Sequence, residues 1–172
     1  RIAAPPFGAQ DKTADAIDLF RVADRYHALL ELGKEFGVVP MVELWGFSKN
    51  LSRLGEVLMV VVEGRHDRAS LLLDVYHLYK GGSFFSGLGH LAGQLIGLFH
   101  FNDYPATPDR SVICDADRVY PGDGIAPLEE IIRELYTIGY RGMLSLELFN
   151  EIYWSQDAAT VLRTGLEKMQ AV

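Results

Sequence analysis

The pattern that most restricts the fold of this chain is a short apolar run that ends in one metal-competent side chain and occurs four times. The runs are PMVELWG, LLLDVYHLY, GLFHFNDY and GMLSLELFN, which carry Glu43, Asp74, His100 and Glu147. An uninterrupted apolar run is typical of a buried parallel strand, and an acid at its carboxyl end needs a partner or a site. We interpret these four residues as a site.

The spacing of the four residues predicts alternating strands and helices. Successive intervals are 31, 26 and 47 residues, and the first two are about the length of one strand-plus-helix unit. The carboxyl ends of the strands in a parallel barrel all lie on one face. Four residues at the ends of successive strands are therefore expected to converge.

Hydrophobic periodicity predicts five strand-helix pairs. Strands are expected at 1–6, 38–45, 70–76, 98–101 and 143–148, and helices at 13–36, 51–63, 127–138 and 157–169. A weaker, glycine-rich helix is expected at 83–95, and a long loop at 102–125. Thr13 and Asn50 are the predicted N-caps of the first two helices. This α/β order predicts a parallel sheet covered by helices, and no glycine-rich phosphate loop follows the first strand to favour a doubly wound sheet.

Length and composition predict one globular domain over residues 1–172, since 49% of the residues are hydrophobic and can form a substantial core. The net charge of −7 argues against a broad nucleic-acid surface. No apolar run of about 18 residues and no signal-peptide pattern occurs, so no membrane contact is predicted. Cys114 is the only cysteine, which excludes an intrachain disulfide and predicts a cytoplasmic location.

Five stretches, VELWG, LLLDVYHLY, HFNDYP, DADRVYPGDG and LSLELF, together resemble the xylose isomerase-like superfamily of TIM barrels, and within it the sugar phosphate isomerase/epimerase group. The resemblance implies one divalent metal held by Glu43, Asp74, His100 and Glu147. It also implies a partial (β/α) barrel of about five units, strands four to eight. The first three units are then either absent from this chain or supplied by a second copy. An open sheet edge predicts a homo-oligomer.

The predicted ligands are three carboxylates and one imidazole, which suit Mn²⁺, Mg²⁺, Co²⁺ or Zn²⁺. A metal that chelates a carbonyl and its neighbouring hydroxyl acidifies the C–H between them and stabilises an enediolate. Glu43 and Glu147 are expected to transfer the proton, as the resembled epimerases imply. His77, Asp103 and Arg118 are the predicted substrate-binding residues.

Each of these three residues has an alternative role. In these alternatives, His77 would be a structural histidine, Asp103 would cap its own loop, and Arg118 would pair with Asp115 or Asp117.

The function predicted is metal-dependent isomerisation or epimerisation of a small sugar or polyol. An inosose dehydratase or isomerase with the same single-metal site stays open, as does a metal-binding barrel fragment without activity. A hydrolase resembling type IV apurinic endonucleases is a further alternative. That family uses three zinc ions and a D-x-H pair, whereas this sequence reads Asp117-Arg118-Val119.

Overall fold

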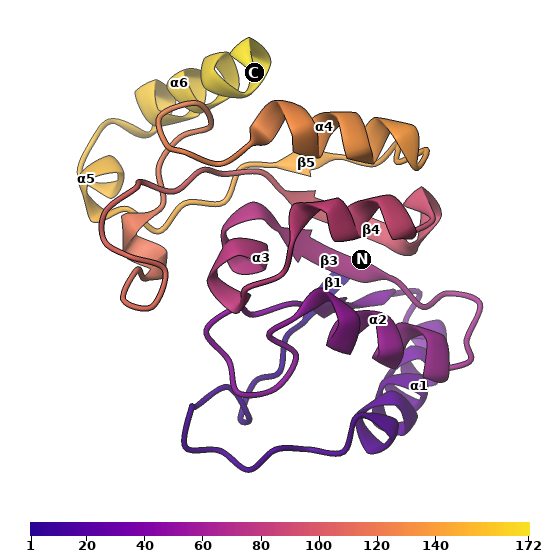
Figure 1. Cartoon of the computed structure of the whole chain (residues 1–172). Coiled ribbons are helices and arrows are strands. Elements are labelled where there is room, and N and C mark those ends of the chain that lie inside the picture. The colour runs from indigo at the N-terminus through magenta and orange to yellow at the C-terminus, as the bar shows by residue number, and fades with distance from the viewer.

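The computed structural model describes all 172 residues and contains one parallel sheet whose five strands follow one another in chain order (Figure 1). Each neighbouring pair of strands is parallel, as expected for β-α repeats. The strands are β1 (Ile2–Ala4), β2 (Pro40–Glu43), β3 (Leu71–Asp74), β4 (Ile96–His100) and β5 (Leu144–Ser145).

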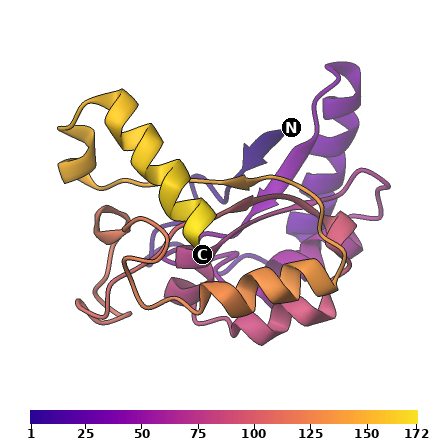
Figure 2. The ribbon, with the colours of Figure 1, turned by 90° about the horizontal axis from the view of Figure 1, so that it is seen from above.

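Six α-helices connect and cover these strands. They are α1 (Leu19–Glu35), α2 (Leu54–Glu63), α3 (Val75–Gly81), α4 (Leu128–Thr137), α5 (Glu151–Trp154) and α6 (Ala158–Ala171). The view from above shows α4 and α6 on different sides of β5 (Figure 2). Two short 3-10 helices, η1 (Phe85–His90) and η2 (Gly93–Leu95), stand where one weak helix was predicted.

Alternation of side chains along the strands separates the apolar core from the predicted site. Successive side chains of a strand point to opposite faces of the sheet, so residues that are adjacent in sequence contact different surroundings. One face packs against α1, α2 and α4, and the other faces the inside of the curved sheet. The core side carries Val42, Leu73 and Phe99, and the inner side carries Glu43, Asp74 and His100.

Helix α1 begins later than predicted. Its N-cap is Asp18, whose carboxylate accepts a hydrogen bond from the N–H of Phe20 at 2.8 Å. Thr13 lies in the preceding loop, where its N–H donates to Asp11 at 2.7 Å. Threonine and aspartate are both good N-caps, so local sequence did not distinguish the two positions.

Helix α2 also begins later than predicted, at Leu54. Glu56 provides the capping interaction, because its carboxylate accepts from the N–H of Arg53 at 3.0 Å. Asn50, the predicted cap, is buried and accepts instead from the N–H of Ile17 at 2.9 Å. Its side chain therefore joins the loop after β2 to the loop after β1.

Strands β3 and β5 are shorter than predicted. β3 ends at Asp74 because this residue caps α3, its carboxylate accepting from the N–H of His77 at 2.9 Å. β5 contains only Leu144 and Ser145, so Glu147 lies just beyond the strand. As an edge strand, β5 has hydrogen-bond partners on one side only.

None of the helices combines the length and the apolar character that crossing a lipid bilayer requires. Cys114 is a free, exposed thiol. The cytoplasmic location stays a prediction.

Replacing Leu73 by alanine should lower the free energy of unfolding by about 2–5 kcal/mol, because the side chain is fully buried between β2 and β4. Urea denaturation followed by circular dichroism measures this change. Leu166→Ala is the matched control, since Leu166 is 57% exposed on α6 and its loss should change stability by less than about 0.5 kcal/mol. Equal midpoints for the two variants would contradict the assigned core.

Candidate active site

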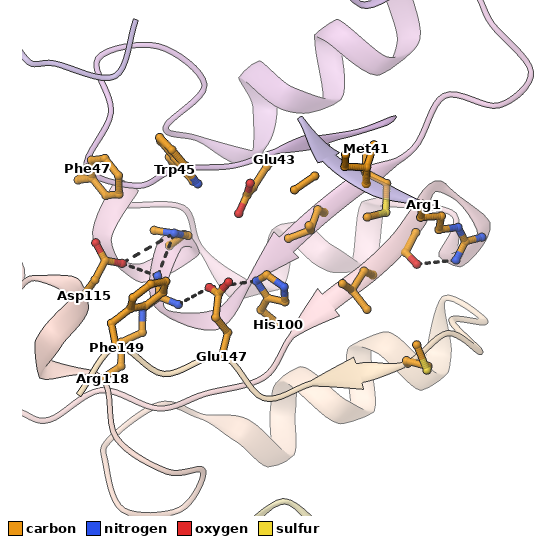
Figure 3. A pocket seen from close by; sticks show the side chains of 17 residues that line it. Arg1, Met41, Glu43, Trp45, Phe47, His100, Asp115, Arg118, Glu147 and Phe149 are labelled. Atoms are coloured by element: carbon orange, nitrogen blue, oxygen red, sulfur yellow. Dashed lines mark hydrogen bonds and ion pairs between the residues drawn. The ribbon is translucent and has the colours of Figure 1, made fainter. Parts of the chain in front are cut away.

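One cavity of about 850 Å³ extends along the inner face of the sheet to its carboxyl end and is lined by residues of β1 to β4 and of the segments before and after β5 (Figure 3). Because the strands are parallel, their carboxyl ends all point to this rim. The polar and aromatic side chains that line it are Arg1, Glu43, Trp45, Phe47, His77, His100, Asp115, Arg118, Glu147 and Phe149. Asp74 lies fully buried beside His100 and Glu147.

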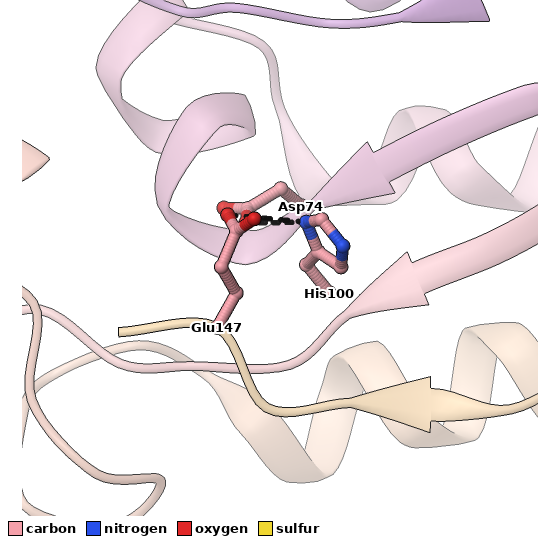
Figure 4. A group of neighbouring side chains, drawn as sticks. All are labelled: Asp74, His100 and Glu147. Atoms are coloured by element: carbon pink, nitrogen blue, oxygen red, sulfur yellow. Dashed lines mark ion pairs between the residues drawn. The ribbon is translucent and has the colours of Figure 1, made fainter. Parts of the chain in front are cut away.

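Asp74, His100 and Glu147 form a compact group of possible metal ligands (Figure 4). Their ligand atoms all lie within 4.8 Å of one another. His100 Nδ1 is 3.2 Å from Glu147 Oε2 and 3.5 Å from Asp74 Oδ2. This nitrogen is buried but makes no hydrogen bond, and a ring nitrogen facing two carboxylates has the chemistry of a metal ligand. The residues present therefore fit a divalent cation.

Glu43, the fourth predicted ligand, lies in the same cavity but outside this compact group. Its side chain extends from β2 into the cavity, across from Glu147 and His100 (Figure 3). Burial raises the pKa of Glu43 to about 7, and the charges of Glu147 and Asp74 act in the same direction. A carboxyl with such a pKa can both give and take a proton near neutral pH.

Arg118 provides the positive charge that the buried carboxylates need. Its Nη1 donates to Glu147 Oε2 at 2.8 Å and to Asp74 Oδ2 at 3.1 Å. Nη2 bonds Asp115, which also lines the cavity. Burial alone would raise the pKa of Asp74, but Arg118 and His100 outweigh it and hold the pKa below its usual range. Arg118 is itself completely buried.

The imidazole of His100 responds to the same two acids. Burial opposes its protonation, but the adjacent carboxylates of Asp74 and Glu147 favour the charged ring and raise the pKa of His100 to about 9. For Glu147, burial would raise the pKa, yet His100 outweighs it and lowers the pKa. The group is therefore strongly coupled, and its negative charges are balanced by His100 and Arg118.

His77 lies at the edge of the cavity, next to Arg118. Its Nε2 is 3.0 Å from Arg118 Nη2, and the ring is buried. Burial lowers the pKa of His77, which favours a neutral ring whose Nε2 accepts from the guanidinium. His77 and Arg118 thus both lie beside the cavity, where substrate contacts were predicted for them.

Asp103, in contrast, lies outside the cavity. It is 1% exposed, and its carboxylate accepts from the N–H groups of Gly122 at 3.1 Å, Gly124 at 3.0 Å and Ala126 at 2.9 Å. A Cβ at position 124 would come within 2.3 Å of Asp103 Oδ1, so the turn requires glycine there. The substrate contact predicted for Asp103 has no counterpart in this arrangement. Its carboxylate instead holds the long loop after β4, which is the alternative role predicted for Asp103 from the sequence.

The sequence analysis did not identify Asn102, and it named Asp115 only as a possible ion-pair partner of Arg118. Asn102 is fully buried, donates from Nδ2 to Asp74 Oδ2 at 3.0 Å and accepts from the N–H of Tyr76 at 3.1 Å. It therefore fixes the orientation of Asp74. The available signal was an amide that directly follows an apolar strand, two residues after His100.

Residues 3–172 match the sequence model of a family described as xylose isomerase-like TIM barrel. The chain belongs to this family. The resemblance identified from the sequence motifs is therefore confirmed.

Four curated relatives are named inosose isomerase. The one from Halalkalibacterium halodurans is 30% identical over 138 residues, which are 80% of this chain and 49% of that protein. The one from Bacillus subtilis is 27% identical over 138 residues, again 80% of this chain and 49% of the relative. The chain thus spans about half the length of the curated relatives it matches.

Solved structures show the same fold. A crystal structure of the IOLI protein with a bound zinc atom superposes with a TM-score of 0.87 at 24% identity, covering 97% of this chain and 60% of that chain. D-Psicose 3-epimerase with D-tagatose, from Clostridium cellulolyticum H10, gives a TM-score of 0.70 at 21% identity, covering 94% and 58%. The five parallel strands are therefore part of an α/β barrel, as predicted.

Zn²⁺ or Mn²⁺ should bind the protein with one-to-one stoichiometry, and His100→Ala should weaken binding by roughly 100-fold or more, because one of three converging ligands is lost. Isothermal titration calorimetry after treatment with a chelator measures both. Glu129→Gln removes an exposed acid on α4 and should leave the affinity unchanged. Unaltered binding by the His100 variant would exclude this group as the metal site.

Proposed function

We propose that this chain is part of a divalent-metal-dependent enzyme that isomerises or epimerises polyol ketones, either ketoses or inososes. The observation that carries the proposal is that one cavity contains the Asp74, His100 and Glu147 group and, facing it, a carboxyl of near-neutral pKa, Glu43. Membership of the family and the names of the curated relatives support the substrate class. Because the chain spans about half of those relatives, the activity of the whole protein is part of the proposal.

Asp74, His100 and Glu147 would hold a single divalent cation, with Glu43 as the further ligand suggested by the sequence. Mn²⁺, Mg²⁺, Co²⁺ and Zn²⁺ all accept carboxylate and imidazole ligands. When bound, such an ion polarises a substrate carbonyl and the adjacent hydroxyl, which acidifies the C–H between them.

Glu147 and Glu43 would move the proton between the two faces of the substrate. Glu147 has a lowered pKa and stays ionised near neutral pH, so it can take the C–H proton. Glu43, with its pKa raised to about 7, can return a proton from the other side of the cavity. Proton removal and return at one carbon, on opposite faces, is epimerisation through an enediolate.

Arg118 and His77 would bind substrate oxygens. Nε of Arg118 is buried and has no hydrogen-bond partner, although buried donors are nearly always paired. Because the side chain is completely buried, a substrate oxygen would reach this donor only after neighbouring side chains move apart. The guanidinium also lies 5.1 Å from the centre of the Phe149 ring, which lines the same cavity.

Solvent exchange of a substrate C–H proton tests this chemistry directly. Metal-loaded protein should incorporate deuterium from D₂O into a ketose or an inosose, and Glu147→Gln should slow the incorporation by roughly 100-fold or more. Proton NMR over a panel of ketoses and inososes measures it and also detects any dehydrated product. Glu167→Gln, an exposed acid on α6, is the control. If metal binds but no substrate exchanges with any of the four ions, the alternative of a metal-binding fragment without activity is supported.

We also propose that copies of the chain associate through the open edges of the sheet. β1 pairs only with β2, and β5 pairs only with β4. Beside these edges, Ile2 is 55% exposed and Met143 is 74% exposed, and both are apolar. A second copy would cover these side chains and the unpaired backbone groups.

Light scattering during size-exclusion chromatography should show a mass that rises with protein concentration, and Met143→Lys should shift the protein towards the monomer because a charge cannot be buried there. Phe84→Lys is the control, since Phe84 is exposed and lies in the connection between β3 and β4, neither of which is an edge strand. A monomer at every concentration would refute the association.

A further inference from the structure

A second cavity of about 850 Å³ opens on the same rim of the sheet, next to the candidate active site. Residues of the loops after β1, β2 and β4 and from the end of α3 line it. Phe47 lines both cavities, so the two adjoin at this residue. Loops that follow the strands of a barrel are the usual place for ligand contacts.

The charge of this second cavity is opposite to that of the whole chain. Lys12, Lys49, Lys80 and Arg110 line it, and Asp109 is the only acid among its lining residues. The chain as a whole carries a net charge of −7, whereas this cavity is lined by four cations and one carboxylate, so its charge differs from that of the average surface. A concave site with one sign of charge concentrates ligands of the opposite sign.

None of the four cations has a carboxylate partner, and three of them bond to nothing else in the chain. Lys12, Lys49 and Arg110 are exposed and make no ion pair and no side-chain hydrogen bond, whereas Arg118 in the neighbouring cavity bonds three carboxylates. The guanidinium carbon of Arg110 lies 6.0 Å from the centre of the Tyr79 ring. The donors of these three side chains are therefore available to a ligand.

Lys80 fixes the loop that carries Arg110. Its Nζ donates to the carbonyl oxygens of Arg110 at 3.0 Å, Ser111 at 3.2 Å and Ile113 at 2.6 Å. Burial and the nearby charge of Lys12 lower the pKa of Lys80. Like charges are thus held close together at a place where no acid pairs with them, and a bound anion would relieve this repulsion.

We propose that this second cavity binds a phosphate monoester. A phosphate dianion presents oxygens to the planar fork of Arg110 and to the point charges of Lys12 and Lys49, which are the two kinds of donor that bind phosphate in proteins. The phosphate would belong to the substrate or to a separate phosphorylated ligand. Assignment to the substrate rests on the proposed function, whereas the binding itself does not.

Inorganic phosphate and fructose 6-phosphate are the probes for binding, by calorimetry in a buffer of low ionic strength. The native protein should bind both, and the double variant Lys49→Gln/Arg110→Gln should bind them at least roughly tenfold more weakly. Arg163→Gln, an exposed residue on α6 without an ion pair, tests the effect of a lost charge elsewhere and should bind like the native protein. Because Lys49 and Arg110 are exposed, the variants should fold, which circular dichroism checks.

Absence of binding, or equal binding by the double variant and the native protein, would overturn the proposal. The exchange assay with fructose and fructose 6-phosphate then identifies the source of the phosphate. A raised KM for the phosphorylated ketose alone, in the double variant, assigns the phosphate to the substrate. Phosphate binding that leaves both KM values unchanged supports a separate phosphorylated ligand. Exchange with neither ketose would count against the proposed function, and the calorimetry would still decide the site.

Discussion

The buried guanidinium of Arg118 is the interaction on which the candidate active site depends. It bonds Asp74, Glu147 and Asp115, which lie on three separate segments of the chain. Carboxylates buried without a counter-charge would repel one another and take up protons. Arg118 is the main cause of the lowered pKa of Asp74, and His100 is the main cause of the lowered pKa of Glu147, whereas burial raises the pKa of Glu43 to about 7. The two cations therefore keep two of the acids ionised and leave Glu43 able to exchange a proton near neutral pH.

The packing of the sheet makes this arrangement possible. Each strand that delivers a polar group to the rim also delivers an apolar neighbour to the core, as with Leu73 beside Asp74 and Phe99 beside His100. Asn102 then orients Asp74 from the next strand end, and Asp103 uses its carboxylate to hold the loop that carries Arg118. Adjacent residues thus connect the apolar core, the group of possible metal ligands and the loop that carries Arg118. A substitution in one of these three is expected to affect the other two.

The two cavities on the rim differ in how their charges are paired, although loop 109–118 contributes to both. Asp115 and Arg118 face the cavity in which acids and cations balance, and Arg110 faces the cavity with an excess of unpaired cations. The two adjoin at Phe47. The proposed metal site and the proposed phosphate site lie side by side, which would suit a ligand that presents a polyol to one and an anionic group to the other.

The sequence by itself determined the β-α order, the parallel sheet and the rim position of Glu43, Asp74, His100 and Glu147, because apolar runs and strand-end acids are local patterns. Its errors at Thr13 and Asn50 arose where several good caps stand close together in sequence. Only the tertiary structure decided that Asp103 faces its own loop, that Arg118 lies beneath three carboxylates, and that Glu43 stays outside the compact ligand group. The first two outcomes depend on the fold of the loop of residues 102–125, which contains Asp103 and Arg118. Contacts between residues far apart in the chain leave no periodic trace in the sequence.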